Sequence, residues 1–287
     1  MIFLLALSIV TASLYSIVLH KVNFKENGSV FLFNLLCSAI WCVCLLIANG
    51  FGLYLDGNVL LWGIVYGITQ ALFILFKARA MNEGSVSLTT LIGNCSLLIS
   101  VFVCYILWSE SVSFADMVGL AVLMLAIVLT TYKKTSFRFT KKWLVYTIFF
   151  LVLAAMVGLV FKAFSKTTSK HAGDMMIVAS AVMFISYTII CLVNGDLRSK
   201  LPPLIKKHPN RFFITVSIAG LLSCVYNRLN IYLSGELIGS VFFSCFNGGV
   251  VVLSTMLGVI LLRERLKPLQ FVGIAFGIVG ICIIGIL

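Results

Sequence analysis

Charged residues are scarce in this 287-residue sequence. Asp, Glu, Lys and Arg together make up 10% of it, whereas 61% of the residues are hydrophobic and the mean hydropathy is +1.14. A water-soluble domain carries about 25% charged residues, which it needs to cover its core with a hydrated surface. The deficit excludes an ordinary soluble protein and predicts a chain that folds in a lipid bilayer.

Acidic residues are the scarcest of the charged ones. Nine Asp and Glu face 21 Lys and Arg, so the formal net charge is +12. A basic protein can bind nucleic acid, but here the bases lie in short loops between apolar runs and leave little aqueous surface for such a partner. An excess of Lys and Arg on cytoplasmic loops explains the charge more simply, and we expect no nucleic-acid partner.

Histidine is rare, and cysteine lacks the spacing of a metal site. The three histidines, His20, His171 and His208, show no ligand spacing, and no two cysteines form a C-x-x-C pair. All nine cysteines lie inside apolar runs, where we expect small buried hydrophobic side chains: Cys37, Cys42, Cys44, Cys95, Cys104, Cys191, Cys224, Cys245 and Cys282. The sequence therefore predicts no metal, no cofactor and no disulfide framework.

Ten apolar runs are long enough to cross a bilayer, which takes about 20 residues. The first begins at Met1 without a basic leader or a small-residue cleavage site, so we interpret it as a retained helix and not as a signal peptide. Backbone groups in lipid must bond within their own segment, which makes all ten runs helices. The expected spans are about 2–19, 29–48, 59–80, 84–107, 115–132, 143–164, 174–193, 211–234, 237–262 and 269–286.

One segment of the chain occurs twice. Residues 84–132 align with residues 239–287 when one extra residue is allowed, and Gly84, Ser85 and Val86 match Gly239, Ser240 and Val241. Further identities pair Gly93 with Gly248, Leu98 with Leu253, Glu110 with Glu264, Val118 with Val272, Gly119 with Gly273, Ala121 with Ala275 and Ile127 with Ile281. Such repeats are typical of transporters built from two related halves.

Extending the repeat backwards divides the chain into two halves of five helices. The first repeat covers 1–132, a basic cytoplasmic linker covers 133–142, and the second repeat covers 143–287. Because five crossings are odd, the second repeat must enter the membrane from the opposite side. The sequence therefore predicts an all-α integral membrane protein with ten transmembrane helices in two five-helix inverted repeats.

Basic residues gather in alternate loops. The loops after the odd-numbered helices carry Lys21, Lys25, Lys77, Arg79, Lys133, Lys134, Arg138, Lys141, Lys142, Arg198, Lys200, Lys206, Lys207, Arg211, Arg263, Arg265 and Lys267. The loops after the even-numbered helices carry little beyond Lys166 and Lys170. Since cytoplasmic loops are enriched in Lys and Arg, we expect both termini to be extracytoplasmic.

The end of the chain resembles a known transporter family. The run Leu262-Arg263-Glu264-Arg265-Leu266-Lys267-Pro268-Leu269-Gln270, followed by Gly273 and Gly280, is similar to the final helix pair of the drug/metabolite transporter superfamily, EamA-like branch. Trp108-Ser109-Glu110-Ser111 with Gly119 matches the same pattern in the first half. The resemblance covers the whole ten-helix layout, but its sharp motif occupies only about the last quarter of each half.

This resemblance implies a transporter that moves a small solute through a central cavity. In the family, the first four helices of each half line the cavity and the fifth is peripheral. The sequence departs from the family in two ways. Many relatives have cytoplasmic termini, and the small cation exporters rely on an acid in their first helix, whereas here the first and sixth helices contain none and the sixth offers Lys162.

The two matched glutamates and glycines favour structural roles. Glu110 and Glu264 stand at turns, where a carboxylate can accept backbone N–H bonds and complement a helix dipole. Gly119 and Gly273 belong to the same motif, and Gly273, Gly277 and Gly280 would let the last helix pack closely on a neighbour.

The eighth helix carries the strongest candidate for a solute contact. Tyr226, Asn227, Arg228 and Asn230 form a polar cluster about two turns inside its predicted outer end. An Arg at this depth costs at least about 2.5 kcal/mol unless it faces a protein or water-filled cavity, although its long side chain could also snorkel to the interface. We expect Arg228 to contact the solute.

Five further polar residues lie within apolar runs. Lys77 and Lys162 could line the pathway or snorkel, Gln70 could face the cavity or another helix, and Asn94 and Asn247 could bond the solute or join helices. Bases outnumber acids at these positions. That balance favours a solute with an anionic group over a bare cation.

The leading functional interpretation is a metabolite transporter of the inner membrane of a bacterium, working by alternating access on an anionic or zwitterionic solute, for example an amino-acid-like one. A multidrug or cation exporter is the alternative within transport. A membrane-embedded enzyme is the runner-up from another class, but no H-E-x-x-H or G-x-S-x-G motif is present, so we expect no enzyme. A non-transporting receptor or scaffold is the third option. The substrate, the coupling ion (H⁺ or another) and the choice between monomer and homodimer stay open.

Overall fold

The computed structural model describes residues 1–21, 30–131, 140–167, 171–203, 209–262 and 268–286, and all regular structure in these residues is helical. The helices of the first half are α1 (Ile2–Lys21), α3 (Val30–Ala48), α4 (Gly57–Glu83), α5 (Val86–Asn94), α6 (Ser96–Trp108) and α7 (Phe114–Thr131). Those of the second half are α8 (Lys141–Thr167), α9 (Ala172–Val193), the short α10 (Asp196–Ser199), α12 (Pro209–Glu236), α13 (Gly239–Leu262) and α14 (Pro268–Ile286). An all-helical chain is as expected.

Among the described residues, eight segments are long and apolar enough to cross a membrane: Val30–Ala48, Gly57–Glu83, Leu88–Trp108, Phe114–Thr131, Lys141–Thr167, Ala172–Val193, Phe212–Glu236 and Gly239–Leu261. The apolar parts of α1 and α14, Ile2–Val18 and Pro268–Ile284, are slightly shorter. These helices fit an integral, multi-pass membrane protein, because the hydrocarbon core of a bilayer can surround apolar helix surfaces of this length.

The fourth expected span differs from the prediction in one respect. It is not one helix over 84–107 but two, since α5 ends at Asn94 and α6 begins at Ser96. Cys95 lies at the junction, where its N–H bonds to the carbonyl oxygens of both Leu91 and Ile92. The interruption brings Asn94 and Ser96 to the middle of the bundle, which matters for the cavity described below.

Local signals account for where several helices begin and end. The carboxylate of Asp56 accepts a hydrogen bond from the Val59 N–H at 2.6 Å and caps α4. Ser113 and Asp116 bond each other's backbone N–H at 3.0 Å, which forms a capping box at the start of α7. Ser109 ends α6 in the left-handed conformation, with φ of 50°.

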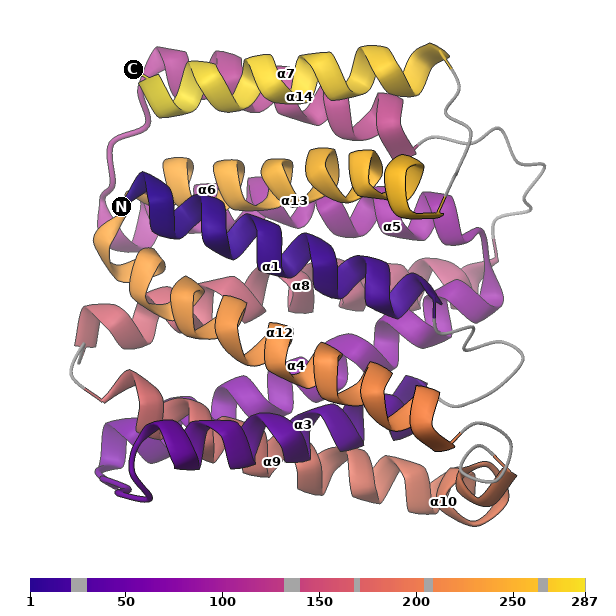
Figure 1. Cartoon of the computed structure of the whole chain (residues 1–287). Helices are drawn as coiled ribbons and strands as arrows, with labels where there is room; N and C mark the ends of the chain where they lie inside the picture. Colours follow the sequence, from indigo (N-terminus) through magenta and orange to yellow (C-terminus); the bar gives the residue numbers. More distant parts are fainter. Residues whose placement is uncertain (22–29, 132–139, 168–170, 204–208, 263–267, 287) are drawn as a thin grey trace.

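The helices run side by side, and both termini lie at the same end of the bundle (Figure 1). We call this end the terminal end; α4 and α13 also begin there, at Gly57 and Gly239. The opposite end, where α4 finishes and α8 begins, carries Lys77, Arg79, Lys141 and Lys142, and we call it the basic end.

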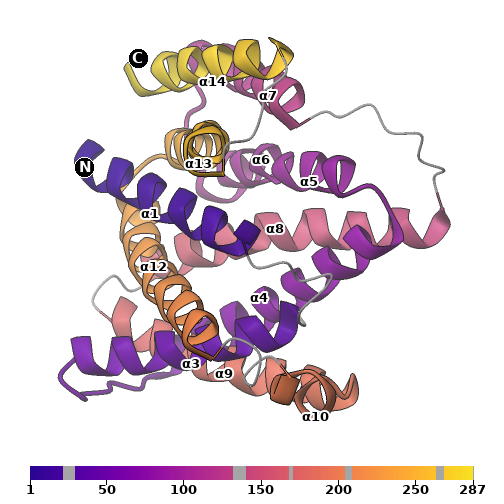
Figure 2. The ribbon, with the colours of Figure 1, turned by 45° about the vertical axis from the view of Figure 1, so that its right-hand side comes forward.

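Contacts between helices of the two halves hold the bundle together. α4 packs against α8 and α9, α3 packs against α9, and α1 packs against α12 and α13 (Figure 1, Figure 2). The helix pair α7 and α14 lies on one side of the bundle (Figure 2).

Glycines allow α7 and α14 to approach closely. A Cβ added at Gly119 would overlap Ile284 and come within 3.1 Å of the Gly280 carbonyl oxygen. At Gly273 an added Cβ would lie 3.0 Å from the backbone nitrogen of Thr130. Gly119 and Gly273 therefore occupy positions where a larger side chain would separate the two helices. Glu264, the other motif residue of the second half, lies outside the described residues.

Candidate functional site

A cavity of about 260 Å³ lies between α4, α5 and α6 of the first half and α8, α12 and α13 of the second half. This volume falls below the roughly 300–1,000 Å³ of pockets that take drug-sized ligands, so it suits a small molecule. Its walls combine polar and aromatic side chains: Tyr66, Gln70, Phe73, Lys77, Thr90, Asn94, Ser96, Ser100, Phe150, Phe161, Tyr226, Asn227, Asn230, Phe242, Phe243, Phe246 and Asn247, with Gly93, Ala154, Val157 and Gly158.

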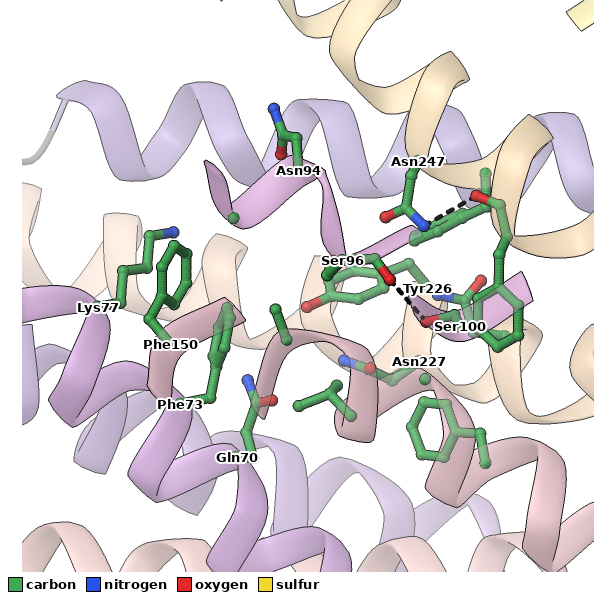
Figure 3. Close-up of a pocket in the computed structure, with 18 of the residues that line it drawn as sticks. Gln70, Phe73, Lys77, Asn94, Ser96, Ser100, Phe150, Tyr226, Asn227 and Asn247 are labelled. Atoms are coloured by element: carbon green, nitrogen blue, oxygen red, sulfur yellow. Dashed lines mark hydrogen bonds between the residues drawn. The ribbon is translucent and has the colours of Figure 1, made fainter. Parts of the chain in front are cut away.

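The structure brings together seven of the nine residues that the sequence suggested for a solute pathway. Of these nine, the residues that line the cavity are Gln70, Lys77, Asn94, Tyr226, Asn227, Asn230 and Asn247. All of them except Asn230 are labelled in Figure 3. Arg228 and Lys162 do not, and each is described separately below. Lys77 is the only charged residue among the lining residues that the structure describes.

Some lining residues near the basic end are more exposed than two rings near the terminal end. Phe73, Lys77 and Asn94 are partly exposed, whereas Phe242 and Phe243 are each 2% exposed. Lys77 lies six residues before the end of α4, about 9 Å at the helical rise per residue. Phe242, by contrast, is three residues into α13, which starts at the terminal end. Three side chains near the basic end thus keep some exposed surface, whereas the two rings near the terminal end keep almost none.

Several lining amides are already bonded to the protein. Asn227 accepts a hydrogen bond from Tyr66 Oη at 3.1 Å and donates one to the Ser223 carbonyl at 2.8 Å. Asn230 accepts one from Ser8 Oγ at 2.6 Å, which joins α12 to α1. Asn247 donates to the carbonyl of Phe243 in its own helix at 2.8 Å. These bonds fix the wall of the cavity and leave only part of each amide for a ligand.

Three of the polar lining side chains make fewer bonds to the protein. Lys77 and Asn94 make no side-chain hydrogen bond or ion pair with the residues that the structure describes, and Gln70 Oε1 is buried without a partner there. Gln70 and Lys77 are seven residues apart on α4 and so share one helix face. Figure 3 places them around Phe73 and Phe150.

Aromatic rings form the remaining wall. The Phe73 and Phe150 ring centroids lie 5.3 Å apart, and Lys77 Nζ lies 5.7 Å from the Phe73 centroid. Nearer the terminal end, Tyr66 stacks on Phe161 at 4.4 Å, and Phe242 lies 5.1 Å from Phe243. Sequence reasoning missed these rings, because a Phe or Tyr in an apolar run looks the same whether it faces lipid, the core or a cavity.

Lys162 is buried in an ion pair near the terminal end of the bundle. Its side chain is 0% exposed, and Nζ lies 2.7 Å from Glu110 Oε1 and 3.1 Å from the Leu237 carbonyl oxygen. Glu110 Oε2 in turn accepts a hydrogen bond from the Gly239 N–H at 2.6 Å. We call Glu110, Lys162 and Gly239 the ionic clamp. The sequence suggested that Lys162 could line the pathway or snorkel; the structure shows it in this clamp and not among the residues that line the cavity.

The ionic clamp connects the two halves of the molecule. Glu110 follows α6 in the first half, whereas Lys162 on α8 and Gly239 at the start of α13 belong to the second. A carboxylate at the N-terminus of a helix meets free N–H groups and the positive end of the helix dipole. Asp116 adds a second contact of this kind, since its Oδ2 accepts from Ser240 Oγ at 3.3 Å. Glu110 thus caps a helix of the other half and not the one that follows it.

Arg228 lies away from the cavity. It is exposed, and its guanidinium lies beside Gly173 at the start of α9, where an added Cβ would also come within 2.8 Å of Asn49 Oδ1. Asn227 and Arg228 are consecutive on α12 and so differ by about 100° around the helix axis. This rotation turns Asn227 inwards and Arg228 towards the terminal end of α3 and α9. Arg228 was expected in the solute pathway, and in this structure it does not line the cavity.

Comparisons with known proteins bear on the fold alone. No protein-family model and no curated protein matches the sequence. One crystal structure of a protein matches over 98% of this chain and 98% of its own, with a TM-score of 0.75 and 15% sequence identity. The two chains therefore share an overall helical architecture from end to end. The class that fold and composition define is a multi-pass helical membrane protein.

Proposed function

We propose that this protein is a membrane transporter that moves a small anionic or zwitterionic metabolite through the cavity by alternating access. The chain resembles the EamA-like branch of the drug/metabolite transporter superfamily, and we propose the inner membrane of a bacterium as its location. The solute passes unchanged, and a coupling ion such as H⁺ can accompany it.

One observation carries this proposal. A cavity with polar lining residues lies at the meeting of helices from both halves, and Lys77 and Asn94 in its wall are partly exposed while Phe242 and Phe243 are buried. Intramembrane polar groups are costly, and they mark solute pathways when they face an internal cavity. We propose that this cavity is reached from the basic end only in the present state, as one state of an alternating-access carrier requires.

The helix contacts support two related halves. If α1, α3, α4, α6 and α7 correspond to α8, α9, α12, α13 and α14, the α4–α8 contact becomes α12–α1 when the halves are exchanged. Likewise, α4–α9 becomes α12–α3, and α6–α8 becomes α13–α1; all six contacts are present. Pairs α3–α9 and α7–α14 map onto themselves. These pairs fit two halves related by a pseudo-twofold axis, although α8–α12 and α13–α14 have no comparable counterparts in α1–α4 and α6–α7. We propose that the repeats are inverted because each half has an odd number of crossings.

If the two halves move relative to each other during transport, the ionic clamp between them takes part in the transport cycle. In the proposed cycle, the cavity opens at the terminal end when α8 and α13 move away from the turn that carries Glu110. That movement would separate Lys162 and the Gly239 N–H from the carboxylate. We propose that the clamp and the rings of Phe161, Phe242 and Phe243 seal the terminal end in the present state.

Transport itself is tested by solute counterflow into proteoliposomes, with metabolites of different charge and with protein-free liposomes as the baseline. Ser100→Trp provides a variant that fills the cavity, since Ser100 lines it and is 2% exposed. Leu98→Trp is its matched control on the same helix, because Leu98 is 42% exposed and does not line the cavity. We expect Ser100→Trp to abolish counterflow and Leu98→Trp to retain it. Equal counterflow in both variants, or none above the protein-free baseline for the wild type, would contradict the proposal.

Sidedness is tested with single cysteines in a cysteine-free background. Lys141 at the basic end and Asn58 at the terminal end are both exposed at the starts of their helices. With the basic end cytoplasmic, an impermeant maleimide added to whole cells should label Asn58→Cys and not Lys141→Cys. The reverse pattern would invert the proposed orientation.

A further inference from the structure

The charge balance of the cavity restricts the proposed solute further than the overall composition does. Lys77 is the one charged residue among the described lining residues, and no carboxylate is among them. An ammonium group in this cavity would therefore meet a like charge and have no anionic partner. An anion would meet Lys77 Nζ, which the described residues leave without an ion pair.

The surroundings of Lys77 indicate what such an anion looks like. One lysine balances one negative charge, so a monoanion leaves the cavity neutral while a dianion leaves an uncompensated charge in a low-dielectric site. Gln70 and Asn94 also line the cavity, and each carries an amide N–H₂ group. Phe73 and Phe150 place two rings, 5.3 Å apart, next to the amine.

From these observations we infer that the transporter binds a small aromatic monocarboxylate, with the carboxylate on Lys77 and the ring against Phe73 and Phe150. This inference rests on the proposed function and narrows it, since it removes zwitterions from the solute class. The volume of about 260 Å³ suits a single ring with a short substituent.

Snorkelling is the competing explanation for Lys77, and the neighbouring Arg79 shows the difference. Arg79 is exposed and lies over the ring of Tyr146 at 5.9 Å, outside the lining residues. Lys77, two residues earlier on α4, lies over Phe73 within the cavity wall. The pair therefore provides a matched test: both variants remove one positive charge from the basic end, but only one of them changes the cavity.

The experiment measures binding by calorimetry to the purified protein in nanodiscs. Three probes of the same size differ in charge: benzoate, benzamide and benzylamine. We expect wild type to bind benzoate at least about tenfold more tightly than the other two, as a charge-assisted hydrogen bond would give. Lys77→Gln should lose that preference, Lys77→Arg should keep most of it, and Arg79→Gln should keep all of it.

Two nanodisc compositions separate a solute from a lipid headgroup. In discs of phosphatidylcholine alone the benzoate preference should match that in discs containing phosphatidylglycerol. Weaker benzoate binding in the anionic discs would show that a lipid headgroup occupies Lys77, which would overturn the solute assignment. Tighter or equal binding of benzylamine, no measurable benzoate binding, or a preference that survives Lys77→Gln would also overturn it.

The experiments distinguish a wrong solute assignment from a wrong proposed function. Benzoate binding without counterflow of any solute would leave the monocarboxylate site standing and contradict transport. Counterflow of a zwitterion or a cation without benzoate binding would uphold transport and remove this inference. Each variant is first checked for a monodisperse elution profile, so that loss of folding is not read as loss of binding.

Discussion

Two lysines at opposite ends of the cavity meet opposite conditions. Lys162, near the terminal end, is 0% exposed and contacts both a carboxylate and a backbone carbonyl. Lys77, near the basic end, is partly exposed and lines the cavity without an ion pair among the described residues. A cation inside a membrane protein needs a partner. For Lys162 the fold supplies that partner, and the ion pair holds helices together. For Lys77 it does not, and an anion from solution can be the partner.

The largest effect is expected from Glu110→Ala, which would leave Lys162 buried without its counter-ion. Breaking a buried pair by removing one partner costs about 3–5 kcal/mol of folding free energy, and Gly239 would also lose its cap. We expect a strongly lowered free energy of unfolding, measured by titration with SDS in mixed micelles.

A double variant provides the control for this first prediction. Glu110→Gln with Lys162→Met removes both charges and keeps an acceptor for the Gly239 N–H. It should recover most of the lost stability, because two buried charges replaced together leave no uncompensated group. If the double variant were as unstable as the single one, the ion pair would not be the source of the effect.

Replacing Lys77 is expected to leave the free energy of unfolding nearly unchanged or to raise it slightly. Lys77→Met removes a charge that the fold does not pair, so the free energy of unfolding should stay within about 0.5 kcal/mol of the wild type or rise. The same SDS titration measures it. A loss comparable to that of Glu110→Ala would show that Lys77 is structural and would end the contrast between the two lysines.

The smallest effect is expected for Arg228, which the structure places outside the cavity. Arg228→Ala and Arg228→Lys should leave the affinity for benzoate unchanged, since the guanidinium lies beside Gly173 and Asn49. Calorimetry on the two variants checks this. A clear loss of affinity in both would return Arg228 to the solute pathway and favour a different rotation of α12.

Much of the fold could be predicted from the order of the residues. Long apolar runs mark helices because an isolated backbone in lipid has no other way to satisfy its polar groups. The interruption at Cys95 was not predicted, although Gly93 and Asn94, two weak helix formers, directly precede it in a run that contains no proline. Only the packing around Asn94 shows why a break is tolerated there: it lies against a cavity and not against lipid.

The site was predicted only in part, because the sequence does not show how each helix is rotated about its own axis. Membrane helices are apolar on nearly every side, so the usual hydrophobic stripe that reveals the inward face is missing. On α12 the polar cluster was visible, but its members point in different directions: Asn227 and Asn230 are inside at 5% exposure each, and Arg228 is outside. An argument from membrane depth alone could not separate them.

The sequence by itself determined that this chain is an all-helical membrane protein, because composition and run length follow from the solvent that surrounds it. It also supplied the repeat, since Gly84–Ser85–Val86 and Gly239–Ser240–Val241 are visible in the letters. Tertiary structure alone decided which charges are paired. Glu110 lies 52 residues before Lys162 (162 − 110) and 129 before Gly239, and no periodicity connects them. Such a contact depends on how two halves dock, which local propensity does not encode.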